Sequence, residues 1–134
     1  MTAAIFHIDK EGKRTNQDIN NILHMVEPRI REGIKVIVDI VPAICNCYQI
    51  WLFGSQAKGK ANSSSDVDIY IVIYDDDKDH SITGFKIYKQ FYSKKMEIAA
   101  QFFFDFKSYF EEMSYFGDLA REVKEHGILI YELS

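Results

Sequence analysis

WLFGSQAKGKANSSSDVDIYIVI, from Trp51 to Ile73, is the stretch of sequence that decides the fold. It begins and ends with short runs of aromatic and β-branched residues, a composition typical of buried strands. The first run stops at Gly54, and a small, polar loop rich in serine and glycine follows. Asp66 and Asp68 then stand at the start of the second run. The stretch therefore predicts two strands, with polar groups gathered where the loop joins them.

Asp66 and Asp68 are two positions apart, so on a strand their side chains lie on the same face. Their Cα atoms would be roughly 6.5–7 Å apart. Two unit charges 4 Å apart repel by about 4 kcal/mol in a medium of effective dielectric constant ~20. Such a pair is tolerated if one carboxyl group is protonated, if both face water, or if a cation lies between them. With oxygen ligands alone the favoured cation is Mg²⁺, which binds a few carboxylates together with substrate phosphates.

Gly54 and Ser55 supply the complementary half of such a site. A glycine lets the backbone approach a ligand closely. Free backbone N–H groups and the Ser55 hydroxyl can hold a phosphate, above all if residues 55–60 form one helical turn whose N-terminus faces it. We therefore expect phosphate binding at the glycine end of the loop and a cation at the aspartate end.

Gly54-Ser55 and Asp66-Val67-Asp68, separated by ten residues, resemble the signature of the DNA polymerase β-like nucleotidyltransferase superfamily. The similarity is closest to its small stand-alone branch, the minimal nucleotidyltransferases. It covers about residues 30–132, and the paired motifs are its specific part. The resemblance implies an α/β (α+β) fold, a small mixed β-sheet flanked by helices.

Further positions fit the same family pattern. Phe53 precedes the Gly-Ser pair, and Ser65 precedes the first aspartate. Ala57 and Lys58 follow at the place where this branch often carries a small residue and an arginine. Lysine keeps the positive charge but lacks the two-pronged guanidinium. The resemblance implies nucleotide binding by Gly54, Ser55, Lys58 and Ser65.

The family's third metal-binding carboxylate lies on the strand that follows the aspartate pair. We expect that strand at residues 96–104, where one alternating face is wholly apolar and the other carries Glu97 and Gln101. Glu97 is the residue assigned to the third carboxylate, and the alternative is an exposed glutamate at a strand edge. With Asp66 and Asp68 it would bind two Mg²⁺ ions and assist catalysis.

The resemblance implies transfer of AMP from ATP to a hydroxyl group of an acceptor that the sequence does not identify. Some relatives are antitoxins that modify a helical ribonuclease of the HEPN type, so a helical protein partner or a homodimer is expected to complete the site. Two alternatives stay open: a catalytically weak nucleotide-binding adapter or antitoxin subunit that acts through protein contacts, and a structural domain unrelated to nucleotides. The aromatic residues around 109–116 are a candidate contact surface.

Composition agrees with one compact domain of 134 residues, with a core at about 29–132 and an N-terminal extension at 1–28. No apolar run approaches the ~20 residues of a membrane span, and no signal peptide is recognised, so we expect a cytoplasmic protein. Cys45 and Cys47 are too close for an ordinary disulfide and are expected in the core. A net charge of −4 makes a nucleic acid partner improbable.

The other elements follow from periodicity and from turn residues. One helix is expected to end at Pro42, and another to pack through Ile82, Phe85 and Tyr88. The expected helices cover residues 19–26, 28–41, 79–92, 107–115 and 119–126, and a last strand or apolar tail covers 128–131.

Overall fold

The protein is described here from a computed structural model, and the residues described are 6–8, 14–16, 28–54, 66–76, 80–96, 98–115 and 119–133. The elements along the chain are β1 (Phe6–Ile8), β2 (Arg14–Asn16), α2 (Pro28–Ile44), β3 (Cys47–Phe53), β4 (Val67–Ile73), α3 (His80–Ser93), β5 (Ala100–Phe106), α4 (Lys107–Met113), α5 (Leu119–His126) and β6 (Ile128–Leu133). The helix predicted at 19–26 lies outside the described residues. No helix in the described ranges combines the length and the apolar character needed to cross a membrane.

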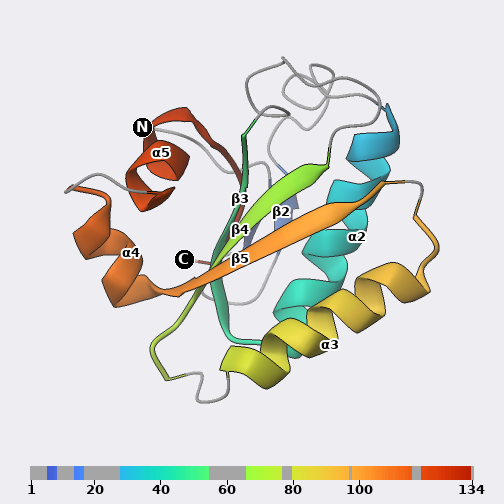
Figure 1. Cartoon of the computed structure of the whole chain (residues 1–134), viewed down its shortest axis with the longest axis horizontal. Coiled ribbons are helices and arrows are strands. Elements are labelled where there is room, and N and C mark those ends of the chain that lie inside the picture. Colours follow the sequence, from blue (N-terminus) through green and yellow to red (C-terminus); the bar gives the residue numbers. More distant parts are fainter. Residues whose placement is uncertain are drawn as a thin grey trace.

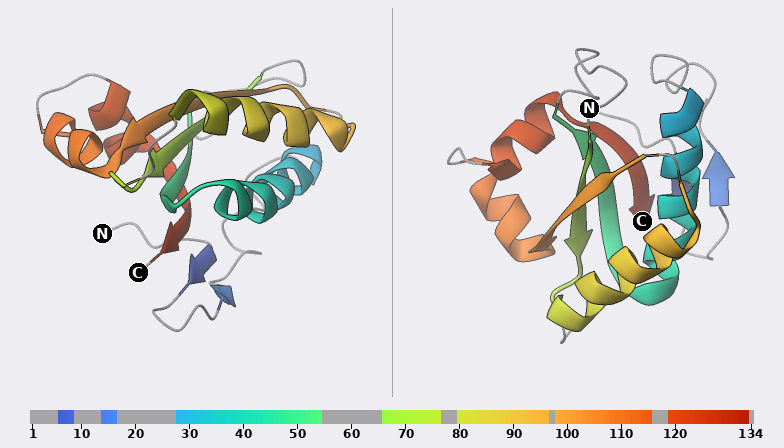
Figure 2. Two further views of the ribbon diagram at one scale, coloured as in Figure 1. Left: turned by 90° about the horizontal axis from the view of Figure 1, so that it is seen from below. Right: turned by 45° about the vertical axis from the view of Figure 1, so that its right-hand side comes forward.

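The strands form one mixed sheet in the order β2-β1-β6-β3-β4-β5. β3 lies in the middle, antiparallel to both β4 and β6, whereas β4 and β5 are parallel and joined through α3. α2 and α3 lie together at one side of the sheet, and α4 and α5 at the other (Figures 1 and 2). This arrangement is the mixed sheet flanked by helices that the sequence predicts.

The larger core lies between the sheet and the helices α2 and α3. The apolar face of α2 is fully buried at Ile30, Ile34, Ile37 and Val41, and each such side chain contributes about 1.5–3 kcal/mol by leaving water. The sequence predicts this face, because Ile30, Ile34, Val38 and Val41 recur at helical spacing. Cys45 and Cys47 are buried free thiols, as expected.

The sequence predicts that α2 ends at Pro42, but the helix continues to Ile44. A proline removes one backbone hydrogen bond and crowds the preceding turn, but here only the last turn of the helix remains beyond it. That turn is closed because the backbone N–H of Cys45 donates to the carbonyl oxygen of Val41 at 3.1 Å. Val41 itself is fully buried, which holds this turn against the core.

α3 packs through a face that shares only Tyr88 with the predicted one, and Tyr88 is partly buried against the larger core. The buried residues of α3 are Thr83, Ile87 and Phe91, whereas Ile82 and Phe85 are exposed. Both sets have helical spacing, so periodicity alone cannot choose between them. The choice follows from α2, against which α3 packs over the sheet.

β5 is an edge strand and begins at Ala100, four residues later than predicted. Its only neighbour in the sheet, β4, begins at Val67, which pairs with Ala100. Residues before Ala100 therefore have no strand of β4 to extend along. Ile98 contributes to the core instead and lies against Gly33 of α2, which accounts for a glycine inside that helix.

Candidate active site

The ends of β3, β4 and β5 bring a glycine turn and three polar side chains to one edge of the sheet, and one of these, Asp66, directly precedes β4. Gly54 directly follows β3, and the last residue of β3, Phe53, pairs with Asp68 near the start of β4. Asp68 in turn pairs with Gln101 near the start of β5. The candidate site is thus built from Gly54, Asp66, Asp68 and Gln101.

Gly54 and Asp68 approach each other so closely that a side chain at position 54 would force the Asp68 carboxylate to move. Gly54 has φ = +74°, in the region that disfavours L side chains. A Cβ atom there would lie 2.5 Å from Oδ2 of Asp68. The sequence therefore needs glycine both for the turn after β3 and for the space that the Asp68 carboxylate occupies.

Asp66 and Asp68 are the two acidic groups of the site. Asp66 is exposed just before β4, and Asp68 is partly buried within it. Partial burial, and secondly the charge of Asp66, raise the pKa of Asp68 above its ordinary value. Both causes disfavour the negative charge, so a cation bound between the two carboxylates would relieve them.

Gln101 is a site residue that sequence reasoning did not select. Its side chain is exposed, between buried Ala100 and Phe102, so it points to the face of the sheet opposite the larger core. Asp68 is placed likewise, between buried Val67 and Ile69. Register therefore sets Gln101 beside Asp68 on the same face. The alternation of residues 96–104 already places Gln101 on the polar face of the strand. Glu97, on the same predicted face, was assigned instead because it is the carboxylate.

The remaining predicted site residues lie outside the described part of the chain. They are Ser55, Lys58, Ser65 and Glu97. Their roles stay predictions. Among the described residues no cluster of three or more His, Cys, Asp or Glu side chains could hold a metal ion, so the described acidic groups of the site are its two aspartates.

A second, aromatic core lies beside the site, on the same face of the sheet as Asp68 and Gln101. Phe53 packs edge-on against Tyr70 and Phe103, with ring centroids 6.1 and 5.3 Å apart. The Tyr70 hydroxyl donates to the Asp105 carboxylate in the next strand. Burial, then this hydrogen bond, raise the pKa of Tyr70, which keeps the hydroxyl a donor. These contacts fix β3, β4 and β5 relative to one another next to the site.

Asp105 precedes the predicted helix at 107–115 and has the side chain of a typical helix cap, but it lies in β5, and Phe106 holds the N-cap position of α4. The backbone N–H of Ser108 in the first turn instead donates to Oδ1 of Asp75, at 3.1 Å. Hydrogen bonds from the side chain and then from the backbone of Ser108 lower the pKa of Asp75. Asp75, the first residue of the acidic run after β4, thus has a structural role.

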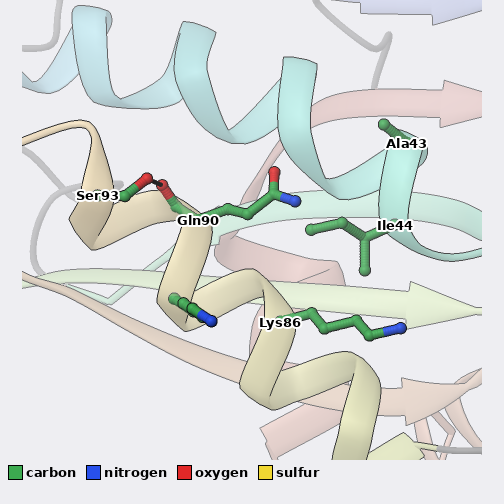
Figure 3. Close-up of a pocket in the computed structure, with 6 residues that line it drawn as sticks. Ala43, Ile44, Lys86, Gln90 and Ser93 are labelled. Atoms are coloured by element: carbon green, nitrogen blue, oxygen red, sulfur yellow. Dashed lines mark hydrogen bonds between the residues drawn. The ribbon is translucent and has the colours of Figure 1, made fainter.

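A hollow of about 520 Å³ lies elsewhere, between the C-terminal part of α2 and α3. Figure 3 shows its lining residues, Ala43, Ile44, Lys86, Lys89, Gln90 and Ser93. α2 and α3 cover the face of the sheet opposite that of Asp68. The hollow is therefore separate from the site of the two aspartates.

The site combines oxygen donors with a tight glycine turn at the edge of a rigid sheet. Two carboxylates and an amide oxygen suit a hard divalent cation. The glycine turn allows the phosphates of a nucleotide to approach the backbone. The arrangement is suited to a phosphate-bearing ligand together with a divalent cation.

Comparison with known structures supports the same fold. A crystal structure of a toxin–antitoxin with AMP-PNP is similar with a TM-score of 0.52 and 16% identity, over 72% of this chain and 70% of that one. A candidate nucleotidyltransferase from Sulfolobus solfataricus is similar with a TM-score of 0.51 and 18% identity, over 79% and 88% of the two chains. Among curated protein sequences none matches this chain significantly.

The sequence profile of one family covers the candidate site. It is the family described as Polymerase beta, Nucleotidyltransferase, and it matches residues 35–134. The matched region is most of the chain and includes Gly54, both aspartates and Gln101. The chain therefore belongs to the polymerase β-type nucleotidyltransferase family.

Proposed function

We propose that the protein is a Mg²⁺-dependent nucleotidyltransferase that moves AMP from ATP to a hydroxyl group of an acceptor. The observation that carries this proposal is the close approach of Gly54 to the Asp68 carboxylate. It unites a backbone turn able to receive phosphates with the acidic groups able to hold their cation. The fold family supports the reaction class, and the choice of ATP and AMP rests on the resemblance in the sequence motifs.

The donor set fits Mg²⁺. Asp66 and Asp68 present oxygen ligands at the sheet edge, and the pKa of Asp68 is raised in a way that a bound cation would reverse. Mg²⁺ would neutralise charge on the phosphates and polarise the reacting oxygen atoms. Gly54 and the Ser55 hydroxyl would hold the triphosphate, with Lys58 and Ser65 near it.

In the proposed step, the acceptor oxygen attacks the α-phosphorus, and the bond from that phosphorus to the bridging oxygen of the β-phosphate breaks. Pyrophosphate leaves, and the proton of the acceptor hydroxyl passes to a base. Glu97 is the base proposed from the sequence, directly or through a water molecule. The task of the chain is mainly to orient the α-phosphate, since positioning and electrostatics supply most catalysis of phosphoryl-type transfer.

The acceptor is proposed to belong to a protein partner. The toxin–antitoxin structure with AMP-PNP supports this, because it pairs a similar fold with a nucleotide and with a partner system. A helical partner of the HEPN type is the specific form that the sequence resemblance suggests, and a homodimer is the alternative. Tyr109 and Tyr115 are exposed on the α4 side of the molecule, and they are available for such a contact.

A second candidate function is a nucleotide-binding adapter with little or no transfer activity. The neutral Gln101 beside Asp68 favours it, because an amide can neither accept the proton of an acceptor hydroxyl nor add charge to a metal site. Binding would need only Gly54 and the two aspartates.

Labelling separates the two functions. The enzyme should transfer label from α-labelled but not γ-labelled ATP to an acceptor in cell lysate, and Asp66→Asn should abolish that transfer. Asp76→Asn is the matched control, since it makes the same change at an exposed aspartate just beyond the other end of β4. Equal labelling by wild type and Asp66→Asn would contradict the proposed chemistry.

An adapter gives a different result. Wild type would label nothing, yet its melting temperature would rise with Mg²⁺ and ATP together. The folded state gains about 2.7 kcal/mol at a ligand concentration 100 times the dissociation constant. An unchanged melting temperature at millimolar Mg²⁺-ATP would contradict both functions.

A further inference from the structure

Gln101 is the described residue of β5 that lies closest in register to the two aspartates. It pairs with Asp68 across two parallel strands, whose Cα atoms are about 4.8 Å apart. Both side chains lie on the face opposite the larger core, and that of Gln101 is exposed. A ligand held by Asp68 is therefore within reach of the Gln101 carboxamide.

The type of residue at this place affects how many cations the site can hold. Two divalent ions about 3.5–4 Å apart repel each other and need shared, negatively charged ligands. A carboxylate from the neighbouring strand would add both charge and a second oxygen. A carboxamide offers one neutral oxygen, so among the described residues the charged ligands of the ion on the β5 side would be the two aspartates.

Asp66 and Asp68 are sufficient for one ion. Mg²⁺ is commonly bound by one or two carboxylates together with substrate phosphates, and it retains several waters. The phosphate oxygens of a nucleotide held at Gly54 would complete that set. The first ion thus needs no third carboxylate, whereas a second one does.

We propose that Gln101 limits this site to one divalent cation, which arrives with the nucleotide triphosphate and is bound by Asp66 and Asp68. This inference rests on the proposed function, since it presupposes nucleotide binding at the same edge. It departs from the two ions expected from the sequence. Gln101 acts as the residue that sets the number of ions, and its carboxamide can donate to a phosphate oxygen.

The experiment counts bound Mn²⁺, a paramagnetic substitute for Mg²⁺, by electron paramagnetic resonance with a nonhydrolysable ATP analogue present. Wild type should bind one Mn²⁺ per chain. Gln101→Glu should bind two and show the spectrum of a coupled ion pair. Gln90→Glu is the matched control, because it adds the same charge at an exposed glutamine of α3, in the hollow on the other side of the sheet, and it should bind one.

A second measurement is the melting temperature, which does not depend on any transfer reaction. Gln101→Glu places a third carboxylate beside Asp68, so without metal it should melt below wild type. Mn²⁺ with the analogue should raise its melting temperature by more than that of wild type. Gln90→Glu should show the same increase as wild type.

The outcomes separate this inference from the proposed function. Two ions in wild type, or one ion in Gln101→Glu, would overturn the role of Gln101 and leave nucleotide binding intact. Absence of any Mn²⁺ and analogue binding to wild type would overturn the proposed function, and this inference with it.

Discussion

Replacing Gly54 with alanine tests the geometry of the site most directly. Gly54 has φ = +74°, and an L residue in the left-handed region costs about 1–2 kcal/mol. The new methyl group would also lie 2.5 Å from Oδ2 of Asp68, and forcing such a contact apart adds about 1–3 kcal/mol. We expect Gly54→Ala to lower the free energy of unfolding by the sum of both parts, about 2–5 kcal/mol.

The assay is thermal unfolding followed by circular dichroism, without metal. For a domain of this size 1 kcal/mol corresponds to about 4 °C, so the melting temperature should fall by about 8–20 °C. Gly84→Ala is the matched control, the same change inside α3. A Cβ atom there meets Phe104 at 3.4 Å, an ordinary contact, and alanine favours a helix by up to about 1 kcal/mol. The control should be neutral or stabilising.

A double-mutant cycle separates the backbone part from the contact part. Asp68→Ala removes the carboxylate that the new methyl group meets, so in that background Gly54→Ala should cost only the backbone part, about 1–2 kcal/mol. The coupling energy should therefore be about 1–3 kcal/mol. If the effects of the two substitutions were simply additive, Gly54 would not be needed for the approach of Asp68, and the argument for a joint site would fail.

Three further predictions follow from single contacts. Asp68→Asn should raise the melting temperature at pH 7 without metal, and the gain should vanish as pH falls below the ordinary pKa of 3.8; a raised folded-state pKa means that ionisation destabilises the folded protein. Tyr88→Phe should speed amide hydrogen exchange at Phe102, whose N–H donates to the Tyr88 hydroxyl at 2.9 Å. Gln49→Leu should destabilise by about 1–3 kcal/mol, because Oε1 of buried Gln49 accepts from the Trp51 indole N–H, a change visible in the fluorescence of the single tryptophan.

Each of these predictions has a contrary result. A gain for Asp68→Asn that persists unchanged at pH 3 would show that repulsion and desolvation are not its cause. Unaltered exchange at Phe102 would mean that water replaces Tyr88 without loss. Unfolding of Gln49→Leu at the wild-type temperature, with unshifted emission, would show that Trp51 finds another acceptor.

The central strands and α2 could be predicted because local sequence decides them. β3 and β4 are largely apolar on both faces and almost entirely buried. Their composition alone therefore predicts two buried strands. Gly54 and the aspartates could be placed together because an antiparallel pair joined by a loop brings the end of one strand to the start of the next. The stripe of α2 is unambiguous in the same way.

β5 could not be predicted as well, because its position depends on pairing with β4 across a helix. The bounds of a parallel strand depend on its partner strand, not on a turn. The alternation of residues before Ala100 fits a strand as well as that after it, so the sequence alone does not show where β5 begins. The expected assignment of Glu97 followed from that longer strand. It stays a prediction, while the register brings Gln101 to Asp68.

The register of β5 is fixed, so only a substitution at position 101 can change the side chain that β5 places beside Asp68. A slip of one residue would turn Ala100 and Phe102 out of the core and the polar residues into it. The outer edge of β5 is also fixed, since the Tyr92 hydroxyl donates to the carbonyl oxygen of Ala100 at 2.9 Å and the Tyr88 hydroxyl accepts from Phe102. Because both faces and the edge define the register, the neutral group beside Asp68 is a property of the fold, and any third carboxylate must reach the site from outside this register.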